Sequence, residues 1–314
     1  MTAAYLHAFG MHVPERVVTN EEIAARVGRT AEWIEDVSGI RERRWAAVET
    51  TVPDLALGAA EDCLTRAGVA ASTLGMILVA SGSARPGFPG PAVEVAVRLG
   101  LEGTPAIDVP MASAGTLFAL AMAAEMTAAF GDVLVIGAEK MSAVIGAERE
   151  GNELDPNTAI LFGDGSGAAL VSSRPGRWQM VDAVLHSDGQ FRDDLAFDWA
   201  GPLRMNGLAV IMQAVRKLPS AIGEVLARQN LAAADVTAFL LHQANQNLLT
   251  RVAKSLAVPA ERVFSNVARY GNTSSASMLI AAAEWSRQDP PAGPVVFAAF
   301  GAGFHWGALL ARST

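Results

Sequence analysis

The feature of this sequence that most constrains its fold is an internal duplication. Residues 53–83 are predicted to form a helix, a short polar link and an apolar strand, and residues 219–245 repeat that order. In both segments apolar residues recur at helical spacing before an "AAS" or "AAD" link, and a β-rich run follows the link. One helix–strand unit therefore occurs twice in the chain.

Two further pairs of segments follow in the same order. They are residues 106–126 with 262–285, each predicted as a strand, a tight loop and an apolar helix, and residues 132–141 with 294–306, each predicted as a strand and a glycine-bearing loop. An offset of 159 residues, which aligns Glu125 with Glu284, also places Ser113 opposite Asn272. Three pairs in one order are hard to attribute to chance, even in an alanine-rich sequence.

The duplication predicts an α/β fold of five layers, in the order helix, sheet, helix, sheet, helix. The predicted strands are largely continuous apolar runs, which suit parallel strands covered by helices on both faces. Pro175 and Gly176 break the pattern, so the predicted halves are residues 1–174, which hold Ser113, and residues 175–314. We expect the two halves to form one rigid body, because no linker separates them.

Composition excludes several other classes of protein. The formal net charge of −8 over 314 residues argues against a nucleic-acid partner, which needs a concentrated basic face. We expect no membrane span and no signal peptide, since every long apolar stretch is interrupted by charge. The single cysteine, Cys63, suits a reducing cytoplasm. The five histidines are scattered, so we expect no metal site.

Three polar residues lie where predicted strands end, which is where parallel α/β folds bind ligands. Ser113 precedes a helix, whose positive end would stabilise an oxyanion. His242, in "LLHQAN", can accept a proton from Ser113 or donate a hydrogen bond to a thioester carbonyl. Asn272, in "RYGNTSS", offers a second N–H donor for that oxygen. Together they predict acyl-transfer chemistry.

Each of these residues alone has an ordinary structural interpretation. A serine in "ASAG" is usually a helix cap, a histidine ending a strand is as often a core residue, and "GNTSS" is a common turn. The equivalent placement in a duplicated fold favours catalysis. The G-x-S-x-G elbow of serine hydrolases is absent around Ser113, and "GDGSG" from Gly163 lacks the lysine of a phosphate-binding loop.

Five blocks together resemble the ketoacyl-acyl-carrier-protein synthase III family of the thiolase superfamily. They are "IDVPMASAGTLFAL", "LFGDGSGAALV", "LLHQAN", "RYGNTSSAS" and "FGAGFHWGALL". The resemblance covers nearly the whole chain and implies the five-layered thiolase fold and a homodimer. It also implies that Phe88 reaches across the dimer to the partner's acyl pocket, and that "GDGSG" is a structural turn.

The resemblance implies a role for each site residue. Ser113 would stand where the family has its nucleophilic cysteine, and His242 and Asn272 would stabilise the enolate formed when a malonyl thioester loses carbon dioxide. The backbone N–H groups of Ser113 and of the Gly303–Phe304 turn would form the oxyanion hole. The residues that would bind the acyl-coenzyme A or acyl-carrier-protein substrate are Trp33, Phe88, Asn245 and Lys254. No cofactor is implied.

Serine at position 113 departs from the family pattern. A serine hydroxyl ionises far less readily than a thiol, and its ester is less electrophilic than a thioester, so condensation should be slower. Three explanations remain open: a natural serine variant, an engineered cysteine-to-serine trap, and a protein that has lost the activity. The alternative functions are acyl transfer to an alcohol or amine without condensation, and a non-catalytic partner subunit.

The donor site departs from the family pattern as well. Val37 and Pro156 stand where the family usually has arginines near the nucleotide of coenzyme A, and Asn247 and Met212 replace basic residues. Fewer cations weaken the recognition of phosphates. These changes predict an altered donor or acceptor, with acyl groups delivered on a carrier protein in a specialised pathway. The expected reaction as a whole belongs to fatty acid or specialised polyketide-type biosynthesis.

Overall fold

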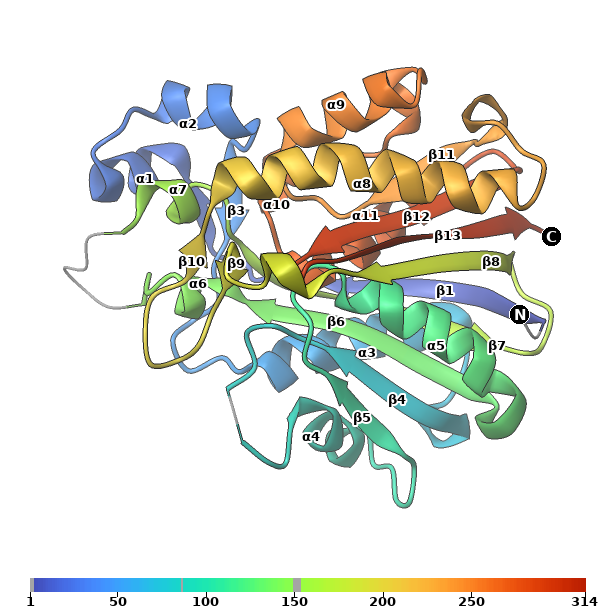
Figure 1. Cartoon of the computed structure of the whole chain (residues 1–314). Coiled ribbons are helices and arrows are strands. Elements are labelled where there is room, and N and C mark those ends of the chain that lie inside the picture. The colour runs from blue at the N-terminus through green and yellow to red at the C-terminus, as the bar shows by residue number, and fades with distance from the viewer. Residues whose placement is uncertain (1–2, 86, 149–153) are drawn as a thin grey trace.

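A nine-stranded sheet forms the centre of the computed structural model, which describes residues 3–85, 87–148 and 154–314 (Figure 1). Its strand order is β11-β12-β13-β8-β1-β7-β6-β4-β5. The strands are β1 (Ala4–His12), β4 (Leu74–Ala80), β5 (Ala106–Val109), β6 (Asp132–Lys140), β7 (Asp164–Ser172), β8 (Trp178–Ser187), β11 (Ala238–Leu241), β12 (Pro294–Gly301) and β13 (His305–Ser313). Two small ribbons add β2 (Val17–Thr19) with β3 (Glu42–Arg44), and β9 (Leu195–Ala196) with β10 (Arg204–Met205).

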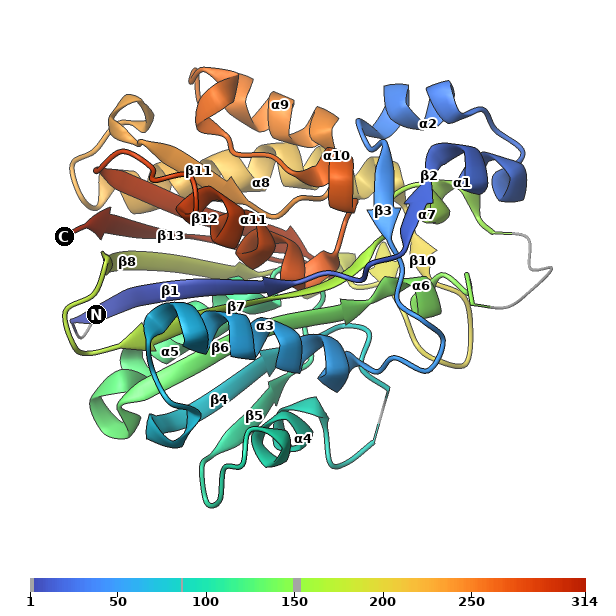
Figure 2. The ribbon, with the colours of Figure 1, turned by 180° about the vertical axis from the view of Figure 1, so that it is seen from behind.

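Helices cover both faces of this sheet (Figures 1 and 2). They are α1 (Asn20–Val27), α2 (Ala31–Ser38), α3 (Val52–Ala67), α4 (Pro91–Arg98), α5 (Gly115–Phe130), α6 (Met141–Val144), α7 (Pro156–Ala159), α8 (Gly207–Ala227), α9 (Gln246–Ser255), α10 (Val267–Tyr270) and α11 (Ser277–Ser286). Within the described ranges, none of these helices is both long and apolar enough to cross a bilayer.

The two halves of the sheet carry equivalent elements, as the duplication predicts. Strands β5, β4, β6, β7 and β1 come from the first part of the chain, and β8, β13, β12 and β11 from the second. Helix α3 packs on β1, β6 and β7, while α8 packs on β8, β12 and β13. Helices α5 and α11 contact strands of both halves, so they form the middle of the five layers. The predicted α/β fold and its layering are confirmed.

The two half-sheets are joined, which the sequence did not predict. Strands β1 and β8 pair antiparallel, from Ala4 opposite Met180 to Leu6 opposite Trp178, so one continuous sheet runs through both halves. The residues between β7 and β8 contain the expected boundary near Pro175. The division into 1–174 and 175–314 itself stays a prediction.

The first repeat is confirmed in its order, with one shift of boundary. Helix α3, a 3₁₀ turn and β4 correspond to α8, a 3₁₀ turn and β11. Helix α8 begins at Gly207, so Pro219 lies inside it rather than near its start. The prolonged apolar face of α8 buries residues on both sides of Pro219, and this packing offsets the cost of the proline.

The prediction of a strand near residue 262 is wrong. Only an isolated bridge joins Val263 to Phe239 there. The buried Gln243 side chain takes the place of a neighbouring strand: its amide donates to the Phe264 carbonyl at 3.1 Å and its carbonyl accepts the Asn266 N–H at 3.1 Å. These backbone groups are therefore satisfied without a ladder.

The prediction that "GDGSG" is a structural turn is also wrong, because β7 already begins at Asp164. The buried Asp164 carboxylate accepts hydrogen bonds from the Ala46 N–H at 2.8 Å and from both the N–H and the hydroxyl of Ser142. Burial raises the pKa of Asp164 to about 6. The segment is thus a strand start that ties three parts of the chain together, and not a turn.

Candidate active site

Ser113, His242 and Asn272 line one cavity of about 590 Å³, although they are far apart in the sequence. Ser113 lies in the turn between β5 and α5, His242 directly follows β11, and Asn272 lies in the turn before α11. All three side chains are buried. The structure therefore brings together the three residues that the sequence singled out for chemistry.

Ser113 has an unusual backbone conformation, with a φ of +62° in the left-handed region. Its N–H donates to the hydroxyl of Ser274 at 3.0 Å, and Ser274 itself has a φ of +47°. Gly301, at the end of β12, lies against this turn so closely that a Cβ there would be 2.3 Å from the Ala112 carbonyl oxygen. Only glycine allows this approach.

His242 is a neutral side chain at pH 7. Burial lowers the pKa of its ring to about 4, against a smaller opposing effect of a backbone hydrogen bond with Ser274. Its Nδ1 lies 2.6 Å from the hydroxyl of Ser277, which also accepts the Gln243 N–H at 3.0 Å. A neutral imidazole offers one donor and one acceptor, so His242 can serve as a base or as a hydrogen-bond donor.

Asn272 is held with its amide nitrogen available. Its Oδ1 accepts the Ser274 N–H at 2.8 Å, while its backbone bonds both to Leu161 and to Gly163. No described residue accepts a hydrogen bond from Nδ2, so its two donors remain for a group bound in the cavity that Asn272 lines.

The prediction for Phe304 requires correction. Its backbone N–H donates to the Asp188 carbonyl at 2.9 Å, and its ring is fully buried against Phe191 and Phe300. This N–H cannot serve an oxyanion. The N–H of Ser113, the other expected donor, already donates to the Ser274 hydroxyl. Neither Phe304 nor Gly303 lines the cavity, whereas Phe300 and Gly301 do. The role of Gly303 stays a prediction.

Two of the four expected substrate-binding residues line the cavity, namely Trp33 and Asn245. The guanidinium of Arg29 lies 5.4 Å from the centre of the Trp33 ring. Phe88 is 98% exposed and lies away from the cavity, and Lys254 is exposed near the far end of α9 from Asn245. The structure does not bring Lys254 to the site. Phe88 is expected in the acyl pocket of a partner subunit, and that role stays a prediction.

A second cavity, of about 180 Å³, meets the first one at Ser113. Ser113, Phe162 and Leu195 border both cavities. Most of the other side chains around the second cavity are apolar; they include Met141, Val144 and Leu203. Sequence reasoning missed this cavity, because its walls come from loops and short elements without a periodic pattern.

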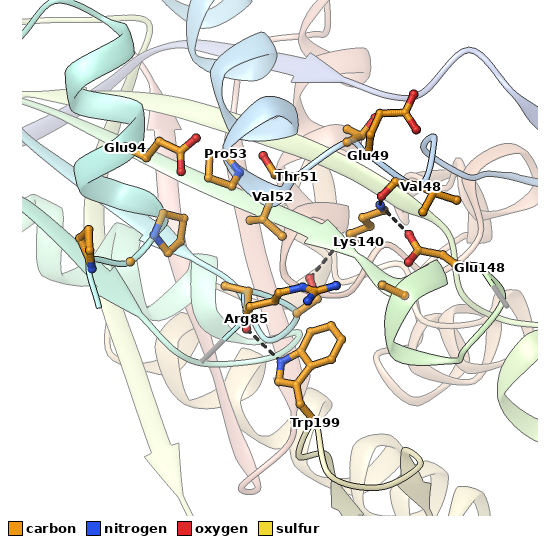
Figure 3. Close-up of a pocket in the computed structure, with 17 residues that line it drawn as sticks. Val48, Glu49, Thr51, Val52, Pro53, Arg85, Glu94, Lys140, Glu148 and Trp199 are labelled. Carbon is orange, nitrogen blue, oxygen red and sulfur yellow. Dashed lines mark hydrogen bonds and ion pairs between the residues drawn. The ribbon is translucent and has the colours of Figure 1, made fainter. Parts of the chain in front are cut away.

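A third cavity, of about 370 Å³, lies beside the loop that carries Phe88 and does not reach Ser113 (Figure 3). The buried cation Lys140 in its wall donates to the carbonyls of Ala47 and Val48 and pairs with Glu148 at 2.5 Å. Because these partners occupy the donors of Lys140, the group serves structure, and the chemistry belongs to the cavity around Ser113.

Comparisons with known proteins agree with this geometry. Residues 107–189 match the family model 3-oxoacyl-[acyl-carrier-protein (ACP)] synthase III, and residues 226–313 match the model of its C-terminal part. A beta-ketoacyl-[acyl-carrier-protein] synthase III of Oleidesulfovibrio alaskensis is 38% identical over 99% of both chains. The chain belongs to the 3-oxoacyl-[acyl-carrier-protein] synthase III family. The two matched regions contain Ser113, His242 and Asn272, and the family expected from the sequence is confirmed.

Solved structures of the same family have the same fold. The 3-oxoacyl-[acyl-carrier-protein] synthase III of Aquifex aeolicus superposes with a TM-score of 0.93 at 32% identity, over 98% of this chain and 99% of that one. The priming beta-ketosynthase of the R1128 polyketide pathway gives 0.89 at 31% identity, over 99% and 96%. The expected thiolase-type fold of a transferase family is thereby confirmed.

Proposed function

We propose that this chain transfers an acyl group from a thioester of coenzyme A or acyl carrier protein to Ser113, and then condenses it with a malonyl thioester. The observation that carries the proposal is that Ser113, a neutral histidine and an asparagine amide border one cavity. The relatives are named beta-ketoacyl-[acyl-carrier-protein] synthase III, which supports this class of reaction.

In the first step Ser113 attacks the thioester carbonyl. His242 takes the hydroxyl proton and returns it to the departing thiolate, so the ring ends neutral. A new C–O bond to Ser113 forms as the C–S bond breaks. The positive end of α5, just after Ser113, stabilises the negative charge that develops on the carbonyl oxygen.

In the second step a malonyl thioester loses carbon dioxide, and its electron pair moves towards the thioester oxygen. The N–H of His242 and the amide of Asn272 stabilise this enolate. Its carbon attacks the ester on Ser113, so a C–C bond forms as the C–O bond breaks, and Ser113 takes a proton from water. Separate cavities on either side of Ser113 would hold the two acyl chains apart.

Acyl transfer to an alcohol or amine is the second candidate, and the serine itself favours it. An ester on Ser113 is a weaker electrophile towards carbon than the thioester of a cysteine enzyme, because an alkoxide leaves less readily than a thiolate. Release of carbon dioxide from a malonyl thioester, measured together with product mass, distinguishes condensation from plain transfer.

The donor is proposed to arrive on a carrier protein. The cavity is lined by Val37 and Leu208, and Met212 lies exposed on α8 one turn beyond Leu208. Apolar side chains at these three positions bind a nucleotide phosphate poorly. We therefore expect weak binding of free coenzyme A, and a dissociation constant in the low micromolar range, measured by calorimetry, would contradict this part of the proposal.

A homodimer is also proposed. Strand β5 is an edge of the sheet, and the apolar Ile107 on it is 40% exposed. The loop with Phe88 ends against this strand, where the Ala92 N–H donates to Asp108 at 2.8 Å. An open strand edge beside exposed apolar groups suits pairing with a second copy.

Intact-mass measurement after incubation with acyl-coenzyme A and acyl-carrier-protein thioesters tests the acyl transfer. We expect one added acyl mass that is absent in Ser113→Ala. If no donor acylates the chain but Ser113→Cys is acylated, the serine acts as a trap. If neither form is acylated, the chain is a non-catalytic partner subunit and the proposal is wrong.

A further inference from the structure

Glu139, on β6, carries a fully buried carboxylate, and within the described part of the chain all of its hydrogen-bond donors are neutral. Its Oε1 accepts the N–H of Gly82 at 3.0 Å and both the N–H and the hydroxyl of Ser275, at 3.2 and 2.7 Å. Its Oε2 accepts the hydroxyl of Ser81 at 3.2 Å and the N–H and hydroxyl of Ser83, at 2.9 and 2.5 Å. The neighbouring Lys140 pairs with Glu148 instead.

Such a carboxylate is stable only if these donors stay in place. Burial of an ionised group without a cation is unfavourable unless hydrogen bonds replace its hydration. The donors come from two segments: the loop after β4, and the turn before α11 in the other half of the chain. Glu139 therefore fixes the position of one segment relative to the other.

The turn before α11 carries part of the candidate active site. Ser275 directly follows Ser274, whose hydroxyl accepts the N–H of Ser113 and whose own N–H donates to Asn272. Both Ser113 and Ser274 have left-handed backbones, which residues other than glycine rarely adopt. Strained backbone conformations persist where the surrounding structure holds them in place. Glu139 accepts two hydrogen bonds from Ser275, the residue next to Ser274.

We propose that Glu139 is a positioning residue for the active site. Its carboxylate holds the turn of residues 272–275 so that Ser274 meets Ser113 and the Asn272 amide faces the cavity. This inference rests on the proposed function in one respect, namely that Ser113 is the group that becomes acylated. Glu139 itself touches no reacting atom and does not line the cavity around Ser113.

A matched pair of variants tests the proposal. Ser275→Ala and Ser83→Ala each remove one buried hydroxyl donor from Glu139, on the side of the active site and of the β4 loop respectively. We expect Ser275→Ala to lower the acylation rate at saturating donor about tenfold, with little change in KM, because displacement of the reacting group by even 1 Å can cost more than that. Ser83→Ala should lower the melting temperature by a similar amount but leave the acylation rate unchanged.

A thiol readout makes the test independent of the acyl donor. In a Ser113→Cys background, iodoacetamide reports the surroundings of position 113, while Cys63 is buried, its pKa raised to about 12 by burial, and stays unreactive. Adding Glu139→Gln should slow alkylation several-fold at a pH where the thiol at position 113 is fully ionised, because the amide nitrogen cannot accept the hydrogen bonds that one carboxylate oxygen accepts and the turn is no longer held.

The outcomes separate the two proposals. If no donor acylates the unmodified chain but Glu139→Gln alters the alkylation, the proposed function fails and the positioning role stands. If acylation occurs and Ser275→Ala and Ser83→Ala change only the melting temperature, or lower the rate equally, the positioning role is overturned. An alkylation rate that Glu139→Gln leaves unchanged also overturns the positioning role.

Discussion

At the scale of single residues, the partner of His242 is a hydroxyl, where many catalytic histidines have a carboxylate. Ser277 lies 2.6 Å from Nδ1, and burial keeps the ring neutral. A hydroxyl can donate or accept, so it permits either tautomer of the imidazole without adding charge. This suits a histidine that accepts a proton in acylation and donates a hydrogen bond in decarboxylation.

The buried His242 makes stability depend on pH in a defined direction. Its pKa falls from the ordinary 6.5 to about 4 on folding, so between these values the unfolded chain binds more protons. Stability should therefore decrease as the pH falls from about 6.5 to 4, by about 3 kcal/mol at most. Urea unfolding of the protein and of His242→Asn at pH 7 and 4.5 checks this, and an equal loss in both would contradict it. Acylation should likewise show no inflection near pH 6.5.

Gly301 gives a second prediction at this scale. A methyl group at this position would collide with the backbone of residues 112–114, so Gly301→Ala should lower the free energy of unfolding by about 1–3 kcal/mol and displace Ser113. Gly223, on an exposed face of α8, has no atom within 4 Å of a built Cβ. Gly223→Ala should raise stability by about 0.5–1 kcal/mol. Thermal denaturation of the two variants measures the contrast.

At the scale of elements, helix α9 is positioned by its N-cap. The side chain of Asn245 accepts the Asn247 N–H at 2.8 Å and donates to the Val37 carbonyl at 3.2 Å, so it joins the start of α9 to the end of α2. Asn245 and Val37 both line the cavity, as does Trp33. The cap therefore shapes the wall of the cavity as well as the helix.

Asn245→Ala should lower the free energy of unfolding by about 1 kcal/mol, the usual effect of losing a cap, and should raise KM for the acyl donor. Lys254→Ala, near the other end of the same helix, removes an exposed side chain with no ion pair among the described residues and should have little effect on stability. Chemical denaturation and steady-state kinetics test both variants. Equal stability of the two would show that the cap contributes little.

At the scale of the whole molecule, the sheet has two unlike edges. Strand β11 is followed by segments that cover it, including the bridge at Val263, whereas β5 has an exposed apolar residue, Ile107, beside the loop of Phe88. Figure 1 shows β5 at the opposite side of the sheet from α8. The asymmetry makes β5 the edge at which the proposed homodimer would pair.

Ile107→Lys combined with Phe88→Asp should convert a dimer to a monomer, because charge on an open strand edge opposes pairing. Met212→Lys, at an exposed position on α8, should leave the assembly unchanged. Light scattering after size-exclusion chromatography measures the mass of each variant. A monomeric unmodified protein, or a dimer that survives the double substitution, would contradict the proposed interface.

The sequence by itself determined the alternation of helices and strands, the duplicated halves and the loops that carry Ser113, His242 and Asn272. These depend on apolar periodicity and on the ends of strands, which are local properties of the chain.

Only the tertiary structure decided which groups touch one another. The pairing of β1 with β8, the use of the Phe304 N–H by Asp188 and the filling of a strand position by Gln243 all join segments that no pattern connects. Glu139 and Ser275 are 136 residues apart, and Ser277 meets His242 across the site. Hydrogen bonds of this kind form when packing brings donors and acceptors within about 3 Å, and local sequence carries no record of that distance.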